Sequence, residues 1–196
     1  MLQAEAFDAS THNGVTRPDE SFPFTLTTDM SSQYRGGHVS GRWSRALADG
    51  GDLALQAFYD RVDIQSVLLD VKHDIFDLEF QQRIPTTPRN EVVWGLGYRR
   101  TELSSDGTDS LSFDPAERGD DLYSGFVQDE LTLVPERLKV TIGSKLEEND
   151  TSGFEVQPTA RFVWTPRASQ TIWGAVSRAV STPSPADTDL RLRSAF

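Results

Sequence analysis

Apolar and polar side chains alternate along much of the chain with a period of two. Between Leu138 and Leu146 the even-numbered residues are apolar except Ser144, and the residues between them are polar or glycine. From Phe154 to Trp164 the even-numbered residues are mainly apolar and the odd-numbered ones mainly polar. A helix would scatter both sets around its axis, whereas a strand sorts them onto two faces. The pattern therefore predicts β-strands.

Nine segments of strand length follow one another, and no stretch predicts a helix of convincing length. We expect an all-β fold in which the strands form an antiparallel up-and-down meander. The predicted strands cover approximately residues 2–9, 34–47, 53–64, 72–84, 91–103, 122–133, 138–148, 154–165 and 170–181.

Two kinds of connection alternate between these segments. Short ones rich in turn-forming residues lie at 48–52, 85–90, 134–137 and 166–169. Longer ones are expected at 10–33, 65–71, 104–121 and after residue 181, and 149–153 is short where a long one is due. In a meander, alternate connections lie at opposite ends, so one end should carry short turns and the other long loops. Outer-membrane barrels have this arrangement, whereas Greek-key sandwiches mix loop lengths at both ends.

Aromatic residues are predicted at both borders of the apolar face. Near the short turns these are Trp43, Trp94 and Trp164, whereas the parity of Trp173 is ambiguous. Near the other connections they are Tyr59, Tyr98, Tyr123 and Phe154. Aliphatic residues lie between the two rows: Leu55, Ala57, Leu96, Val127, Leu131, Val140 and Ile142, with Asp129 interrupting them. Aromatic girdles around an apolar band ~25 Å tall are typical of transmembrane barrels. We therefore interpret the seven residues of the two rows as membrane-interface aromatics. In a soluble sandwich, aromatics should favour strand middles.

The opposite parity is polar and carries charges of both signs. Because an isolated buried charge costs several kcal/mol, this face cannot form a sandwich core. In a barrel it would line the wet lumen or touch a plug. Its members include Ser40, Arg42, Ser44, Gln56, Asp60, Asp77, Glu79, Gln81, Arg83, Gln128, Glu130, Thr132, Lys139, Lys145, Glu147, Glu155, Gln157 and Arg161.

Several phrases occur in one order at barrel-like spacing: YDRVDI, DLEFQQRI, VVWGLGYRR, FVQDE, LKVTIGSKLEEND, FEVQPTARFVWTP and WGAVSRAVSTPSPADTD. Together they resemble the barrel of TonB-dependent outer-membrane receptors. The resemblance implies active uptake of a scarce chelate, most often a ferric siderophore. It also implies outer-membrane lipid and the TonB complex as partners, with energy coupled through an N-terminal box and a plug domain.

Composition narrows the function classes. A formal net charge of −11 argues against nucleic acid as a partner. The absence of cysteine excludes disulfides and thiolate metal sites. No apolar run approaches the ~20 residues of a membrane helix. The first ten residues, MLQAEAFDAS, have no basic and no apolar region of a signal peptide.

We therefore expect residues 1–196 to be one part of a receptor barrel, with signal peptide, TonB box and plug domain outside these residues. Transporters of this class use about 22 strands, and nine would leave two bare edges and an apolar outer face. The isolated chain should aggregate or need detergent. The expected location is the outer membrane of a Gram-negative bacterium.

No constellation predicts catalysis or a cofactor. Asp129–Glu130 and Glu147–Glu148 are adjacent strand residues that point to opposite faces, so neither pair can act across one cleft. The Gly95-Leu96-Gly97 run, half of a dinucleotide-binding fingerprint, lies inside a strand with no helix after it, so we interpret it as permitting a close approach or a bend. The other candidates lack the spacing of metal sites, a calcium loop or a nucleophile elbow: His12, His38, His73, Asp187, Asp189, Ser177 and Ser181–Ser184.

Ligand contacts are expected on the loops, although single residues cannot be assigned. The candidate loops are 10–33, 104–121 and 182–196, with an acidic stretch from Thr108 to Asp121 and the trio Gln33, Tyr34 and Arg35. Two alternatives stay open: a passive outer-membrane channel and a soluble β-rich binding module. The latter would bury Trp43, Trp94 and Trp164 together.

Overall fold

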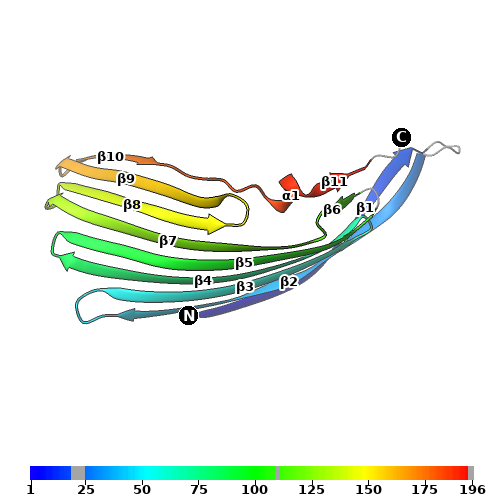
Figure 1. The fold of residues 1–196 in the computed structure, drawn as a ribbon, viewed down its shortest axis with the longest axis horizontal. Helices are drawn as coiled ribbons and strands as arrows, with labels where there is room; N and C mark the ends of the chain where they lie inside the picture. Colours follow the sequence, from blue (N-terminus) through cyan, green and yellow to red (C-terminus); the bar gives the residue numbers. More distant parts are fainter. Residues whose placement is uncertain (19–24, 109–110, 194–196) are drawn as a thin grey trace.

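A computed structural model describes residues 1–18, 25–108 and 111–193 (Figure 1). Its main element is a sheet of nine strands whose neighbours follow the chain order, and every pair is antiparallel. This confirms the predicted all-β meander. The strands are β1 (Leu2–Pro18), β2 (Thr25–Ala46), β3 (Asp52–Ser66), β4 (Leu69–Thr87), β5 (Asn90–Gly107), β7 (Glu117–Val134), β8 (Leu138–Asn149), β9 (Gly153–Arg167) and β10 (Gln170–Ser177).

A small second sheet pairs β6 (Leu111–Phe113) with β11 (Leu190–Leu192), and one short helix, α1 (Pro185–Thr188), precedes β11. In the main sheet β1 and β10 are the two edges, and in the part of the chain that the structure describes they do not pair with each other. The sheet is therefore open, as expected for part of a larger barrel.

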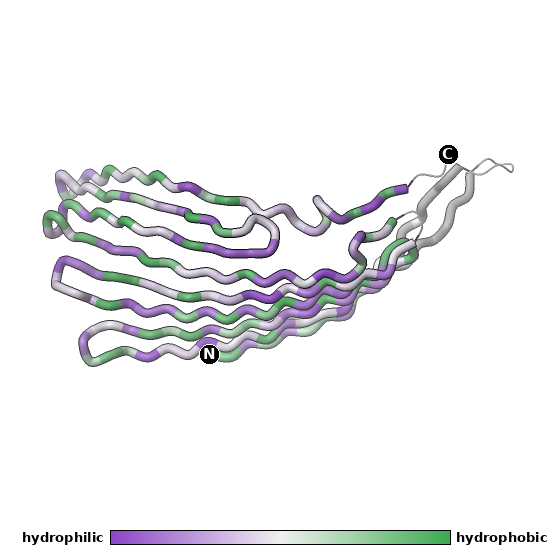
Figure 2. Tube along the Cα trace, viewed as in Figure 1, coloured by the Kyte–Doolittle hydropathy of each residue, from purple (hydrophilic) through white to green (hydrophobic). Residues whose placement is uncertain are grey.

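The register assigns every strand residue to one of two faces, because directly opposed partners point to the same side of a sheet. Trp43, Leu55, Phe80 and Leu96 are successive partners, and their side defines face A. The other side, face B, is defined by Arg42, Gln56, Glu79 and Gly97. Figure 2 shows apolar and polar residues interspersed along each strand.

Over most of the sheet neither face is covered by a second layer, and of the described elements only the small β6–β11 sheet and α1 lie against one end of it. Ala54 is the one buried hydrophobic residue in the described part of the chain, and large apolar side chains are exposed throughout. The accessible surface is 13658 Å², whereas a compact monomer of this mass would expose about 9,300 Å². A soluble sandwich would bury one face of each sheet, so this architecture does not support the soluble alternative.

The strands are longer than the sequence pattern predicts at the end opposite the short turns. The predicted loop 10–33 is wrong for its described residues, because β1 and β2 pair from Leu2↔Gly41 to Pro18↔Thr25. The predicted loop 65–71 is also wrong, since only residues 67–68 separate β3 from β4. Residues 19–24 lie outside the described residues.

Two further boundaries differ from the prediction. The candidate ligand loop 104–121 consists largely of the end of β5, all of β6 and the start of β7. Strand β10, predicted to continue to residue 181, ends at Ser177. The chain then leaves the sheet after Arg178, whose backbone N–H donates to the Pro158 carbonyl at 3.1 Å.

Candidate functional site

The short-turn end of face A carries the predicted tryptophans. Trp43 and Trp164 are 53% and 45% exposed, and each lies within a few residues of its turn. Trp94 is half-buried; it packs on Phe80, with ring centroids 5.4 Å apart, and its Nε1 donates to Gln82 at 3.1 Å. The indoles are thus spread along one uncovered face and are not packed together. Trp173, whose parity the sequence left open, is the partner of Val163 on face B.

A second aromatic row crosses face A further along the strands. Tyr59 is the partner of Phe76, and Tyr98 is the partner of Tyr123, with ring centroids 5.2 Å apart. Phe154 continues the row through Glu148, which is the partner of both Tyr123 and Phe154. Phe76 was not predicted as a row member, although its shared parity with Leu78 and Phe80 was visible in the sequence.

Between the two rows most residues on face A are apolar, although Gln82, Ser144 and Asp129 interrupt them. On β4 the apolar positions run from Phe76 to Ile84, and on β9 from Phe154 to Trp164. These lengths match the roughly 9–11 residues with which a tilted strand crosses the hydrocarbon core. We call the part of the sheet from the short turns to the second aromatic row the band. Asp129 is an exception within it, and it accepts a hydrogen bond from Asn90 at 2.8 Å.

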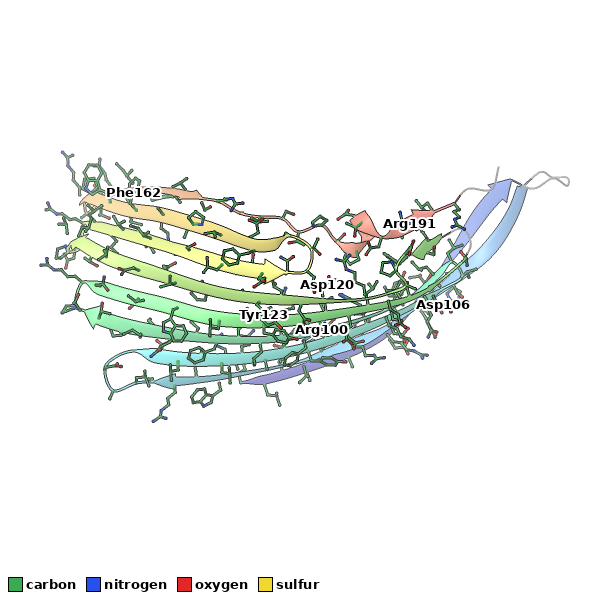
Figure 3. All side chains as sticks on the ribbon, in the orientation of Figure 1. Arg100, Asp106, Asp120, Tyr123, Phe162 and Arg191 are labelled. Carbon is green, nitrogen blue, oxygen red and sulfur yellow. The ribbon has the colours of Figure 1, made fainter. Side chains whose placement is uncertain are left out.

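Beyond the second row, in the part we call the extension, face A becomes charged. Tyr59 and Tyr98 donate their hydroxyls to Asp74 and Asp121, at 2.5 and 2.7 Å. Arg100, which is labelled in Figure 3, is on the same face and contacts Asp121 at 2.7 Å. The register places these charged residues on face A of the extension: Asp8, Arg35, Arg61, Asp63, Lys72, Asp74, Arg100, Glu102, Glu117 and Asp121.

Face B of the extension shows the opposite change, since apolar residues gather there. Tyr34, Ile64 and Val71 are successive partners, and Val62 and Leu103 both pair with His73. The apolar members are Phe7, Ala9, Tyr34, Val62, Ile64, Val71, Ile75 and Leu103. On β1 to β5 the polarity of the two faces therefore inverts at the second aromatic row, whereas β7 carries Arg118 and Asp120 on face B. On β4 the inversion falls between Ile75 and Phe76.

Face B of the band is a polar wall stabilised by ion pairs. Arg83 contacts Asp52 at 2.6 Å and Glu91 at 2.8 Å. Arg99 contacts Asp77 at 2.8 Å, and Asp77 is only 8% exposed. Two further ion pairs join Lys139 to Glu130 and Lys145 to Glu147. This wall suits contact with water or a polar plug and cannot face lipid.

The Gly95-Leu96-Gly97 run permits a close approach on face B. The ring of Phe126 lies over Gly95, so closely that a Cβ there would lie 2.5 Å from its edge. Phe126 is the partner of Gly95 on β7. The sequence-based interpretation of this run as a packing feature is thus supported.

No group of three or more His, Asp or Glu side chains suited to a metal ion occurs within residues 1–18, 25–108 and 111–193. Over the same residues, no helix has the length and apolar character to span a bilayer. The three histidines are dispersed: His38 packs on Phe58 at a ring distance of 5.9 Å, His73 lies on β4, and His12 pairs with Ser31.

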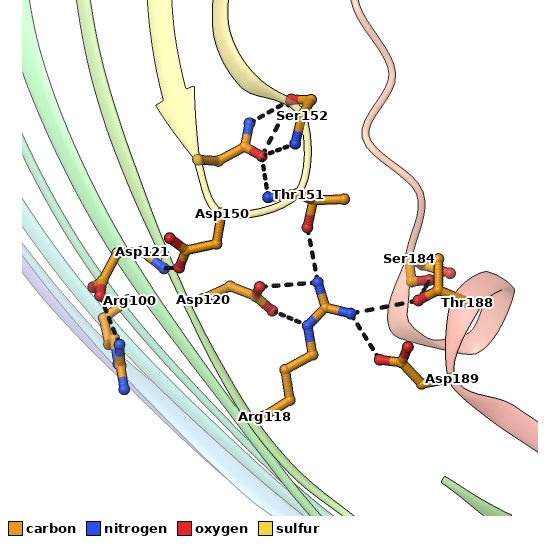
Figure 4. Close-up of polar contacts among 11 residues, drawn as sticks. Arg100, Arg118, Asp120, Asp121, Asp150, Thr151, Ser152, Ser184, Thr188 and Asp189 are labelled. Atoms are coloured by element: carbon orange, nitrogen blue, oxygen red, sulfur yellow. Dashed lines mark hydrogen bonds and ion pairs between the residues drawn. The ribbon is translucent and has the colours of Figure 1, made fainter. Parts of the chain in front are cut away.

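Sequence reasoning missed one polar cluster, centred on Arg118 of β7 (Figure 4). Its guanidinium binds Asp120 on the same strand and Asp189 at the end of α1, each at 2.7 Å. It also donates to Thr151 in the β8–β9 turn at 2.8 Å. The hydrogen bonds from Arg118, and then that from Thr188, lower the pKa of Asp189. Nothing in the sequence pattern joins residues so far apart.

Comparison with known proteins places this geometry in a family. A family model described as "TonB dependent receptor-like, beta-barrel" matches residues 5–191. No curated protein sequence gave a match.

Two solved structures share the fold. The siderophore receptor PirA from Pseudomonas aeruginosa is 15% identical over 92% of this chain, with a TM-score of 0.59. The siderophore receptor PirA from Acinetobacter baumannii is 12% identical over 93% of this chain, with a TM-score of 0.63. This chain spans 34% of the length of each of those structures. With the family model matching nearly all of its residues, the chain belongs to the TonB-dependent receptor-like β-barrel family.

Proposed function

We propose that this chain forms about nine strands of the wall of an outer-membrane receptor that takes up a scarce chelate, in particular a ferric siderophore, with energy supplied through TonB. The observation that carries the proposal is the uncovered apolar band of face A, bordered by aromatic residues and followed by charge.

Lipid explains this band better than water does. Leu96, Val127 and Ile142 are each more than half exposed in the middle of the band. Apolar surface left in water costs about 25 cal/mol per Å², and a continuous patch of this kind promotes aggregation. In a bilayer the same residues meet acyl chains. Two aromatic rows would then lie at the headgroup level: Trp43, Trp94 and Trp164 in one, and Tyr59, Tyr98, Tyr123 and Phe154 in the other.

Face B would line the lumen, and the extension would stand in water outside the cell. Short turns are periplasmic in outer-membrane barrels, so the end with the turns at 47–51, 88–89, 135–137 and 168–169 would face the periplasm. A plug domain, outside these residues, would contact the ion-paired wall and couple it to TonB.

The siderophore assignment draws on the two structural neighbours, both of which are siderophore receptors by name. A test is uptake of radioactive iron by cells with and without the gene, from a panel of ferric siderophores, with labelled cobalamin as a second class of ligand. We expect at least one ferric siderophore to be taken up only when the gene is present. That uptake should also stop in a strain that lacks TonB.

The strain that lacks TonB and the cobalamin measurement distinguish a siderophore receptor from a passive channel and from a receptor for another ligand. Uptake that depends on the gene but continues without TonB would show a passive channel. Gene-dependent uptake of cobalamin alone would keep the transporter and overturn the siderophore assignment.

A further inference from the structure

The edge of the sheet at the end of the extension has a notch at β8 and β9. The turn 150–152 joins β8 to β9 and is the limit of both strands on this side, whereas β5 and β7 continue further and pair as far as Ser104↔Glu117 (Figure 1). The neighbouring ladder between β9 and β10 ends at Thr159↔Ser177. The wall is therefore lower here than at β5 and β7.

Residues 178–193, which we call the strap, leave the sheet at this point and fill the notch. Arg178 makes the last ladder contacts: its backbone N–H donates to the Pro158 carbonyl at 3.1 Å, and its guanidinium donates to the Val156 carbonyl at 2.6 Å. The strap then forms α1 and β11, and β11 pairs with β6.

The strap and β6 meet the sheet on face B. Arg118, which binds the strap, is the partner of Leu103 on that face. Gly107 shares this parity, and the backbone of Leu111 and Ser112 in β6 lies against it so closely that no side chain would fit. The backbone N–H of Asp114 also donates to the Asp189 carbonyl at 2.9 Å, which ties the β6 segment to the strap.

Arg118 is the side chain on which these pieces converge. It holds Asp189 at 2.7 Å from the strap, Thr151 at 2.8 Å from the β8–β9 turn, and Asp120 at 2.7 Å from its own strand. The side chains of Arg118 and Asp189 are 19% and 14% exposed, so solvent screens this pair less than most ion pairs of the sheet. Without the guanidinium, two carboxylates and a hydroxyl would face one another with no cation between them.

We propose that the strap closes the notch above the β8–β9 hairpin and that Arg118 is the clasp that holds it. Release of the clasp frees the strap from β7 and opens a side gap onto face B of the extension. The clasp is a positioning device that touches no ligand. Only its location outside the cell rests on the proposed function.

A cysteine pair reports the closed strap directly, because none of the 196 residues is cysteine. Leu111→Cys and Leu192→Cys replace direct partners of β6 and β11. Such partners lie within the Cα separation that a disulfide requires. In outer-membrane preparations of the receptor, a mild oxidant should cross-link this pair rapidly. Adding Arg118→Ala should slow cross-linking about tenfold, because charge-assisted hydrogen bonds are lost.

Arg100→Ala is the matched control. Arg100 lies on β5, the neighbour of β7 in the sheet, and also binds two carboxylates, Asp121 and Glu102, but it is on face A. It should leave the cross-linking rate unchanged. Asp189→Asn, which removes one charge of the clasp and keeps the shape of the side chain, should slow the rate by a smaller factor than Arg118→Ala and covers the case in which Arg118→Ala does not fold.

Cross-linking at the parental rate in both Arg118→Ala and Asp189→Asn would overturn the clasp. A separate measurement addresses the location: a maleimide that cannot cross the outer membrane should label Leu192→Cys in intact cells. Absence of that labelling would contradict the orientation given under the proposed function, while the cross-linking rates still decide whether the clasp exists.

Discussion

The band and the extension are built from the same strands, yet their faces have opposite polarity. Face A is apolar at Phe76, Leu78 and Phe80 of β4, and it is charged at Asp74 and Lys72 of the same strand. Backbone hydrogen bonding continues across this border without a change of register. The two regions thus share one backbone architecture. They differ in side-chain polarity: face A suits lipid in the band and water in the extension.

The border itself is a row of amphipathic rings. Tyr59 and Tyr98 point their hydroxyls toward the carboxylates of the extension and leave their rings in the band. Such a side chain is stable where an apolar layer meets water, and it would gain little in the middle of either region. Substitutions in the two regions and at their border should therefore differ in how much they destabilise the receptor.

A charge in the band should cost far more than the same charge in the extension. Leu96→Arg, on face A of β5, should destabilise the receptor by about 2–4 kcal/mol in lipid vesicles, because it places a cation near the bilayer midplane. Ser104→Arg, on the same face of the same strand, lies between Lys72 and Glu117 and should stay within about 0.5 kcal/mol. Urea unfolding in vesicles measures both. Equal effects would remove the distinction between the two regions.

Apolar side chains on face B of the extension should stabilise it moderately. Ile75 is half-buried, so Ile75→Ala should cost about 1–2 kcal/mol, which is less than the 2–5 kcal/mol of a packed core. The neighbouring change Asp74→Ala alters face A, where it removes the ion pair with Arg61 and the hydrogen bond from Tyr59. Comparable unfolding curves for Ile75→Ala and the parent would show that face B carries no packing here.

The tyrosine hydroxyls at the border should contribute a single hydrogen bond each. Tyr98→Phe keeps the ring against Tyr123 and removes the bond to Asp121, so we expect a loss of about 0.5–1.5 kcal/mol. Tyr98→Leu should cost more, because it also removes the ring. If the two variants were equally stable, the ring would have no role at the border.

The strap should loosen only in strong acid. Its contact with Arg118 lowers the pKa of Asp189, so the folded pKa lies below the ordinary value of about 3.9. The stabilisation is therefore fully present above about pH 4 and is lost as the pH falls through the folded pKa. Loss of thiolate slows cross-linking at low pH in every variant, so the measured quantity is the cross-linking rate of the strap pair divided by the rate of the same pair in Asp189→Asn. This ratio should be constant from pH 7 to about pH 4 and fall between about pH 4 and pH 3.

The band was predictable from the sequence, and the extension largely was not. Residues such as Leu138, Val140 and Ile142 keep one parity from turn to border, so period-two counting finds both strand and face. On β4 the parity shifts between Ile75 and Phe76, and the pattern is lost near the shift. Residues 10–18 and 25–33 were interpreted as loop for a related reason: these hairpin arms are predominantly polar and small, and small polar residues are typical of loops as well.

The strap and its clasp lay beyond prediction for a different reason. Arg118, Thr151 and Asp189 are brought together by the ends of three separate elements, and no periodicity connects them. Pairing of β6 with β11 likewise depends on where residues 178–193 leave the sheet.

The central claim is that the inversion on face A marks the outer border of the membrane. Nitroxide labels at single cysteines in place of Lys72, Asp74, Phe76, Leu78 and Phe80 on β4 test it, with relaxation by dissolved oxygen compared with relaxation by a water-soluble nickel chelate. In the receptor in lipid vesicles, we predict dominance of the nickel chelate at 72 and 74, a crossover at 76, and dominance of oxygen at 78 and 80. Dominance of the nickel chelate at all five positions would contradict the account.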